Sequence, residues 1–263
     1  MRIDLNADLG EGDGPWRTGP VPDEELLGLV TSVNVAAGFH AGDPSTILAT
    51  CQRARQRGVA VGAHPSYDDY DGFGRRPTDV PAPLLTAQVL YQLGAVDALA
   101  QSVGCVMGHV KPHGALYNRI AQDDEQARAV VEAVLRFGRP LALVGPPGSR
   151  VLALADEAGI ATVREAFIDR AYRPDGTLVP RGQPGALVTS PLLAGERAVR
   201  LATEGTVVAT DGTVIAVPAD TLCVHSDTPG SAQIAGAARS ALAAAGVDVL
   251  PFSSPASDLL DRP

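Results

Sequence analysis

The sequence is poor in aromatic residues and in positive charge, and both shortages narrow the possible functions. Only 4% of the 263 residues are aromatic, which argues against the stacking platform that single-stranded nucleic acids require. The 21 Lys and Arg residues are outnumbered by 30 Asp and Glu residues, which gives a formal net charge of −9. An acidic chain without a local basic patch repels a phosphate backbone. We therefore expect no nucleic-acid partner.

Long apolar runs and paired cysteines are missing as well. No stretch reaches the roughly 18 consecutive apolar residues of a membrane-spanning helix, and the first residues have no signal-peptide core. Cys51, Cys105 and Cys223 stand at wide spacings that suit neither a disulfide framework nor a Cys-x-x-Cys zinc site. The sequence thus predicts a cytoplasmic protein with no membrane partner, whose cysteines are small buried hydrophobes.

Standard nucleotide-binding motifs are also lacking. The glycine-rich turn at residues 145–150 lacks the Lys-Ser/Thr of a P-loop, and no Gly-x-Gly-x-x-Gly follows the first expected strand. A Gly-x-Ser-x-Gly nucleophile elbow is absent too. We therefore do not expect this chain to bind ATP or a dinucleotide by itself through a standard motif.

Short β-rich apolar runs alternate with longer helical patterns along the chain. They give seven or eight β–α units at roughly 30-residue intervals, which is typical of a parallel sheet with helical crossovers. We expect a single α/β domain over residues 1–263, an irregular TIM-like (β/α) barrel with seven or eight strands, and a doubly wound open sheet is the alternative. The expected strands are Arg2–Asn6, Ser32–Ala36, Val59–Ala63, Cys105–Val110, Leu141–Val144, Ala161–Ala166, Thr221–Val224 and Val247–Leu250. The expected helices are Asp23–Leu29, Pro44–Arg57, Pro83–Val103, Asp124–Phe137, Arg150–Ala158, Pro191–Thr203 and Gly230–Ala245.

Three segments interrupt this alternation. The dipeptide Asp211-Gly212 lies between two β-rich runs and predicts a β-hairpin insertion near residues 205–217. Residues 171–181 are expected to form a second protruding arm. The segment 253–263 is rich in Ser, Pro and Asp and is expected to be a loose tail.

Every histidine falls at, or a few residues beyond, the end of an expected strand. A parallel α/β sheet carries its active site at the carboxyl ends of its strands. A lone histidine is more often a structural residue, but five at one edge favour a site there. The five are His40, His64, His109, His113 and His225.

Loops add acidic and basic groups to the same edge. Asp8 stands in the glycine-rich segment 6–14, where it can act as a general base, bind a metal or simply form an Asx turn. Asp43 precedes Pro44 and suits a helix N-cap as well as a site. Arg75 or Arg76 can hold a substrate carboxylate in a bidentate fork. Three candidates at the ends of later strands complete the edge: Glu165, Arg170 and His225.

The densest cluster of polar residues runs from residue 108 to residue 118. In an extended strand His109, Lys111 and His113 point to one side, which in a barrel can be the lumen. A desolvated lysine can have a lowered pKa and act as a base or polarise a carbonyl group. Tyr117 can donate to a developing oxyanion.

Taken together, these motifs resemble the LamB/YcsF family. Two positions depart from the family pattern, because Ala37 stands where members commonly have Cys and Ser226 where they commonly have Gly; the first departure argues against a nucleophilic cysteine. The resemblance runs from the N-terminus to beyond residue 225. The matching stretches are Ile3-Asp4-Leu5-Asn6-Ala7-Asp8-Leu9-Gly10-Glu11, Ser32–Asn34, Gly38-Phe39-His40-Ala41-Gly42-Asp43, Gly62-Ala63-His64-Pro65-Ser66-Tyr67, Gly72-Phe73-Gly74-Arg75-Arg76, Val110–Asn118, Glu165-Ala166-Phe167, Asp169-Arg170 and Cys223-Val224-His225.

The resemblance implies an irregular barrel similar to the glycoside hydrolase/deacetylase superfamily. It also implies one subunit's role in the ATP-dependent opening of the 5-oxoproline (pyroglutamate) lactam to L-glutamate, together with 5-oxoprolinase subunits B and C. ATP would then belong to the whole complex, in agreement with the missing nucleotide motif. The residues expected to be catalytic are Asp8, His40, His64, Lys111 and His113, and those expected to bind substrate are Asn6, Asp43, Arg75, Tyr117, Glu165, Arg170 and His225.

In this hypothesis subunits B and C activate the lactam and this chain completes the hydrolysis. Asp8 or His64 deprotonates water, and His113 protonates the departing ring nitrogen. One alternative is a metal-dependent deacetylase or amidohydrolase that acts without ATP, with a divalent metal on Asp8, His40 and His64. A second alternative is a non-catalytic subunit that only binds the substrate.

Overall fold

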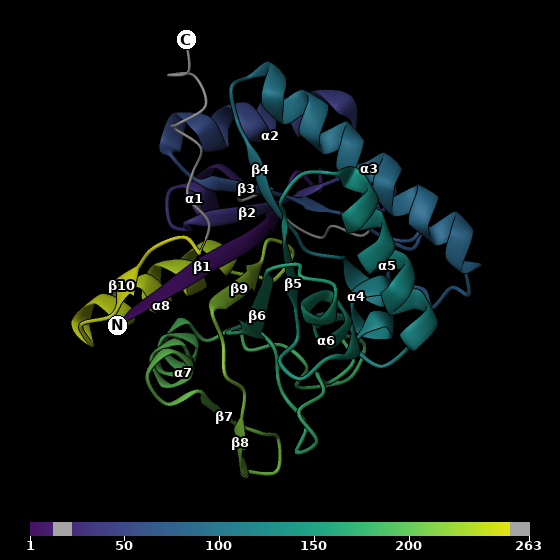
Figure 1. Cartoon of the computed structure of the whole chain (residues 1–263). Coiled ribbons are helices and arrows are strands. Elements are labelled where there is room, and N and C mark those ends of the chain that lie inside the picture. The colour runs from purple at the N-terminus through teal and green to yellow at the C-terminus, as the bar shows by residue number, and fades with distance from the viewer. Residues whose placement is uncertain (13–22, 253–263) are drawn as a thin grey trace.

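Seven parallel strands close into a barrel in the computed structural model, which describes residues 1–12 and 23–252 (Figure 1). The barrel closes because β9 pairs with β6 on one side and with β1 on the other. The short strand β10 (Asp248–Val249) pairs with the start of β1. The closed barrel is therefore confirmed over the open sheet. In spatial order the barrel strands are β1 (Arg2–Leu9), β2 (Ser32–Ala36), β3 (Ala60–His64), β4 (Met107–Val110), β5 (Ala142–Gly145), β6 (Thr162–Phe167) and β9 (Thr221–His225).

Helices surround the barrel, and neighbouring helices pack on one another, α3 on α5 and α7 on α8 (Figure 1). The helix α4 was not predicted, because it is short and follows Pro112 in a segment that is typical of a loop. The helices of the described residues are α1 (Asp23–Leu27), α2 (Pro44–Arg57), α3 (Ala82–Ser102), α4 (Gly114–Ile120), α5 (Asp124–Phe137), α6 (Arg150–Glu157), α7 (Pro191–Glu204) and α8 (Ser231–Ala244).

The limits of α2 follow directly from its sequence. The Asp43 carboxylate accepts hydrogen bonds from the backbone N–H groups of Ser45 and Thr46, which caps the start of the helix. Pro44 occupies the first helical position, where its missing N–H costs nothing. Gly58 ends the helix in the left-handed region, with φ 66°.

Strand β1 separates an apolar core from a polar barrel interior. Ile3, Leu5, Ala7 and Leu9 belong to the main hydrophobic core between strands and helices. The alternate residues carry the polar groups that hydrogen-bond to side chains of other barrel strands, which places them in the lumen. The lumen therefore holds a network of polar side chains, unlike the branched apolar layers common in such barrels. The alternate residues of β1 are Asp4, Asn6 and Asp8.

Two excursions leave the barrel between β6 and β9. Residues 168–190 form an arm with isolated bridges between Arg170 and Leu187 and between Tyr172 and Leu178. The strands β7 (Thr206–Val208) and β8 (Val214–Ala216) form an antiparallel pair around the Asp211-Gly212 turn, at the bottom of the view in Figure 1. The expected tail, 253–263, lies outside the described residues, and the single-domain assignment stays a prediction.

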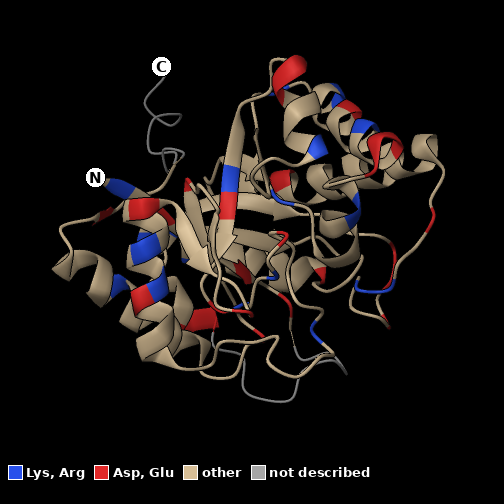
Figure 2. Cartoon of the chain, turned by 90° about the horizontal axis from the view of Figure 1, so that it is seen from below, with Lys and Arg blue, Asp and Glu red and all other residues tan. Residues whose placement is uncertain are grey.

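The outer surface carries charges of both signs. Blue and red segments alternate along the outer helices (Figure 2), and several of these pairs are ion pairs spaced four residues apart, such as Arg136 with Glu132. None of the helices within residues 1–12 and 23–252 combines the length and the apolar character needed to cross a membrane.

Candidate active site

Buried polar side chains converge at the carboxyl ends of the barrel strands. Asp8 was expected in a loop, but β1 extends to Leu9 and carries it inside the barrel. The Lys111 Nζ lies 2.9 Å from Asp8 Oδ1 and 2.8 Å from Glu165 Oε1. Asn34 also donates to Asp8 Oδ1, at 2.8 Å. The residues that the sequence singled out therefore meet across the lumen, although they come from distant parts of the chain.

Lys111 does not have the lowered pKa that a desolvated lysine can have. Burial favours the neutral amine, but the negative charges around it, first of all Asp8, outweigh that effect and hold the pKa of Lys111 well above its usual value. The pKa of Asp8 lies well below its usual value, since His64 and Lys111 overcome the cost of its burial. Lys111 is therefore a fixed positive charge within the site and not a base.

Three histidines lie with Asp8 at the rim of the barrel. The Nε2 of His64 lies 3.3 Å from Asp8 Oδ2 and 3.0 Å from Nδ1 of His113. The ring of His40 stacks flat on His113, with centroids 3.8 Å apart and planes within 5°. Burial first, and then neighbouring histidines, lower the pKa of both His40 and His113 well below the usual value. Both imidazoles are thus neutral at pH 7.

Glu11 belongs to this cluster and was not among the predicted site residues. Its Oε1 lies 3.7 Å from His40 Nε2 and 3.9 Å from His113 Nδ1. Burial, followed by the charges of Asp227 and Asp8, raises its pKa to about 8. The Oγ of Ser226, one of the two departures from the family pattern, donates to Glu11 Oε2 at 2.9 Å. Glu11 lies in the same glycine-rich segment as Asp8, but the sequence analysis predicted only Asp8 as a site residue.

A second group lies beside the cluster and is more accessible to solvent. The Nδ1 of His225 lies 3.0 Å from both oxygens of Asp169, and its ring stacks on Phe167 with centroids 5.1 Å apart. Arg75 donates to Asp227 at 2.6 Å and Arg181 donates to the same carboxylate at 3.3 Å. A substrate anion can take the place of the Asp227 carboxylate between these two guanidinium groups. Arg181, from the arm 168–190, was not predicted.

The remaining predicted residues have different surroundings. Asn6 hydrogen-bonds to Glu165 at 3.0 Å, deeper in the lumen. Tyr117 is buried, and burial together with the Glu165 charge raises its pKa well above 10, so it stays protonated. Arg170 donates to the carbonyl of Val179 at 2.6 Å and thereby holds the arm. The capping role of Asp43 occupies both of its oxygens on the surface of α2.

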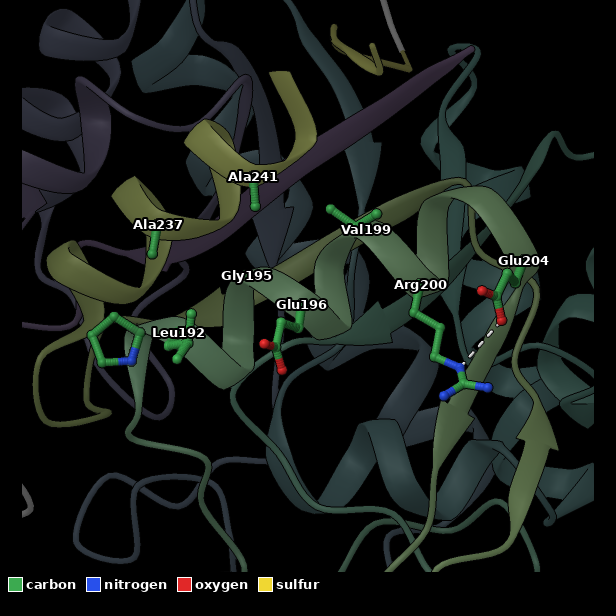
Figure 3. Close-up of a pocket in the computed structure, with 9 residues that line it drawn as sticks. Leu192, Gly195, Glu196, Val199, Arg200, Glu204, Ala237 and Ala241 are labelled. Carbon is green, nitrogen blue, oxygen red and sulfur yellow. Dashed lines mark ion pairs between the residues drawn. The ribbon is translucent and has the colours of Figure 1, made fainter. Parts of the chain in front are cut away.

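A surface groove lies away from these residues. It runs between α7 and α8, where Leu192, Gly195 and Val199 face Ala237 and Ala241 (Figure 3). The groove is also lined by Glu196 and, at one end, by the ion pair of Arg200 with Glu204. Both of its carboxylates are exposed to solvent and no histidine lines it, so the candidate active site is the buried cluster at the rim of the barrel.

Fold and site together define a closed parallel α/β barrel with a buried, ionisable cluster at the carboxyl ends of its strands. The chain belongs to the LamB/YcsF family, whose match spans residues 3–257. It is 52% identical to the A subunit of 5-oxoprolinase from Streptomyces avermitilis over 251 residues, which cover 95% of this chain and 100% of the relative.

Solved structures confirm the fold. A lactam utilization protein from Thermus thermophilus matches with a TM-score of 0.88 and 46% identity, covering 96% of this chain and 100% of the other. A family 4 carbohydrate esterase from Streptomyces lividans matches with a TM-score of 0.50 and 14% identity, covering 96% and 93%. The second likeness concerns the fold alone.

Proposed function

We propose that this chain is the A subunit of an ATP-dependent 5-oxoprolinase, which opens the 5-oxoproline lactam to L-glutamate together with subunits B and C. Relatives of about half-identical sequence over nearly the whole chain carry this subunit's name. The observation that carries the proposal is the buried Asp8–His64–His113 set, in which consecutive polar atoms lie 3.3 and 3.0 Å apart. Such a set can move a proton between water and a leaving nitrogen.

The chemistry that we assign to the site is hydrolysis of an activated lactam. A lactam amide is a poor electrophile, and phosphorylation of its oxygen by the partner subunits would make the ring carbon open to attack by water. Asp8 and His64 would take the proton of that water, and His113 would return one to the ring nitrogen as the C–N bond breaks. The phosphoryl group would stay on the carboxyl oxygen as an acyl phosphate and leave as phosphate when a second water hydrolyses it. The fixed positive charge of Lys111 stabilises the anionic form of Asp8, so Asp8 is deprotonated and can accept a hydrogen bond or a proton from water.

Substrate anions are assigned to the more accessible side of the site. Arg75 and Arg181 share Asp227, and a carboxylate or phosphoryl group can replace that partner with similar geometry. His225, fixed by Asp169, lies near the same side and can donate to a substrate oxygen. This arrangement supports the predicted role of Arg75 and adds Arg181 to it.

Glutamate release from 5-oxoproline tests the proposal. We expect turnover only when this chain is combined with subunits B and C and ATP. Asp8→Asn should lower the rate by about 100-fold or more, the usual size of a general acid–base contribution. Asp175→Asn is the matched control, because Asp175 lies in an exposed turn and accepts only from Thr177. Full activity of Asp8→Asn in the complete mixture would refute the site assignment.

A second candidate is a metal-dependent deacetylase or amidohydrolase that acts without ATP. One observation favours it: atoms of Glu11, His40, His64 and His113 lie within 4.8 Å of one another. Neutral imidazoles and carboxylates are ligands of Zn²⁺ and related ions. Turnover by the lone chain without ATP would select this candidate over the first.

A further inference from the structure

We propose that two copies of this chain associate through the outer face of α3, with the two α3 helices antiparallel and Tyr91 of each copy packed over Gly94 of the other. This assembly does not depend on which reaction the chain performs. Three features of the molecule support it: an uncharged apolar face, a glycine that the single chain does not require, and opposite charges beside the two ends of the helix.

The outer face of α3 is apolar from Leu84 to Ala98. The helix lies along the outside of the molecule, between α2 and α5 and over β3 and β4 (Figure 1). Its exposed positions recur at spacings of three and four residues, which is the spacing of a seam between two paired helices. Leu84 and Tyr91 are 51% and 65% exposed, so the seam includes two large hydrophobic side chains. The positions of the seam are Leu84, Ala87, Tyr91, Gly94 and Ala98.

This seam carries no charge, although the chain has a formal net charge of −9. Asp97 is the one charged residue of α3, and it is buried and paired with Arg139. The neighbouring helix α5 differs, because it exposes ion pairs such as Arg136 with Glu132. In a two-fold pair the same patch meets itself, so any charge on it would meet a like charge. An uncharged face avoids that repulsion and therefore suits a second copy of the chain.

Gly94 lies in the middle of the seam, where the single chain does not require a glycine. A glycine inside a helix lowers helix stability relative to alanine, because it loses more conformational freedom on folding. Gly94 does not adopt a positive φ, and a Cβ there would meet no described atom within 4 Å. In the pair, the missing side chain leaves a hole one turn from Tyr91. The Tyr91 ring of the other copy fills this hole as a knob.

The charges beside the two ends of α3 favour the antiparallel arrangement. Asp79 stands just before the helix, and its side chain is 90% exposed although Arg119 lies 3.5 Å away. Arg55 lies close to Cys105, which follows the end of α3 by three residues. Arg139, just after α5, contacts the same end of α3. Antiparallel pairing places the acidic start of each helix opposite the basic end of the other, which is electrostatically complementary.

Analytical ultracentrifugation of the full chain alone, without subunits B and C or ATP, tests the proposal. We expect a dimer that dissociates on dilution. Tyr91→Glu and Gly94→Leu should each raise the dissociation constant by about 30-fold or more, the loss typical of a central interface residue. Both positions are exposed, so both variants should keep the wild-type circular dichroism. Leu192→Glu, at an exposed position of α7, is the matched control and should change the dissociation constant by less than about threefold.

Cysteine cross-linking measures the direction and register of the pair. With Tyr91 over Gly94 in antiparallel helices, Ala87 of one copy lies opposite Ala98 of the other. A mixture of Ala87→Cys and Ala98→Cys proteins should therefore form a disulfide-linked dimer on mild oxidation, whereas neither variant should do so by itself. The three native cysteines are buried and should not compete.

Several outcomes would overturn the proposal. A chain that stays monomeric at every concentration would exclude a second copy as the occupant, including a monomer that associates only with subunits B and C. A dimer that persists unchanged in both Tyr91→Glu and Gly94→Leu would place the interface elsewhere, and loss of the dimer in Leu192→Glu alone would place it at the groove between α7 and α8. Cross-linking of Ala87→Cys by itself would exclude the antiparallel register.

Discussion

At the scale of single residues, Lys111 is a buried lysine that lies between two carboxylates. It is the only lysine in the sequence, although Lys and Arg together number 21. Its side chain is 2% exposed and touches two carboxylates and the Cys223 thiol. A lone lysine in an arginine-rich chain is a sequence signal for a site that needs a compact charge, since the broad guanidinium group does not fit there.

Acetylation of the native protein tests the burial of Lys111. We expect acetic anhydride to modify the α-amino group and to leave Lys111 unmodified, because its amine is buried and held protonated by Asp8 and Glu165. Mass spectrometry of the digested protein measures both sites. Denatured protein is the control and should react at both. Fast modification of Lys111 in folded protein would contradict its position between the carboxylates.

Asp4, at the opposite end of the lumen, makes the stability depend on pH. Burial raises its pKa to about 6, despite hydrogen bonds from Thr31, Ser32 and Thr221. Between pH 4 and 6 the folded state therefore holds a proton that the unfolded state has released, so stability falls as the pH rises. A difference of about two pKa units corresponds to about 3 kcal/mol.

The variant Asp4→Asn isolates this effect. The free energy of unfolding of the wild type, minus that of the variant, should fall by about 2–3 kcal/mol from pH 4 to pH 7. Urea denaturation at several pH values measures it. A difference that stays constant with pH would show that Asp4 titrates normally.

How far the sequence predicts the site can be judged from a few of these residues. His40, His64 and His113 were predicted from their positions after strands, and the structure brings them together. Glu11 and Arg181 were missed for different reasons. Glu11 looks like a turn residue until β1 is known to extend to Leu9, and Arg181 reaches Asp227 only through the fold of the arm 168–190.

At the scale of elements, a large side chain in the lumen requires a glycine at the facing position of the neighbouring strand. A Cβ on Gly62, in β3, would overlap the ring of His109 from β4. His109 was expected near the end of a strand, and it is the second-last residue of β4, where its Nε2 contacts Asn34 Oδ1 at 3.0 Å. His109 therefore has a structural role, and its ring fits because Gly62 has no side chain.

Gly62→Ala should therefore destabilise the protein by about 1–3 kcal/mol, the usual cost of overpacking. His109→Ala removes the obstructing ring, so the double variant should lose less stability than the sum of the two single changes. Urea denaturation of all four proteins completes the cycle. Strict additivity would mean that the two residues do not compete for the same space.

At the scale of the whole molecule, the sequence predicted a barrel from its number of β–α units, but not which strands pair to close it. The alternation of β-rich and helical segments gives the number of units, and expected and observed limits agree within a few residues for most of them. Closure depends on β9 pairing with both β6 and β1. The pairing of β9 with β1 joins residues more than 200 positions apart, such as Asp4 and Thr221, and no local pattern encodes it.

Closure also predicts a gradient of local stability. β1 is hydrogen-bonded on both sides, to β2 and β9, and its residues 3–9 are buried. The β7–β8 pair forms a separate two-stranded sheet in which Val208 and Val214 are exposed. The amides of β1 should exchange hydrogen only on global unfolding, at least about 100-fold more slowly than those of the hairpin.

Hydrogen exchange followed by mass spectrometry at increasing urea concentrations separates the two elements. Exchange of β1 should accelerate with the same urea dependence as global unfolding, because its amides open only when the barrel does. Exchange of the hairpin should hardly respond, since its opening exposes little surface. Equal rates and equal urea dependence would mean that the hairpin and the barrel unfold as one unit. The β7–β8 segment would then be part of the cooperative core and not an insertion on it.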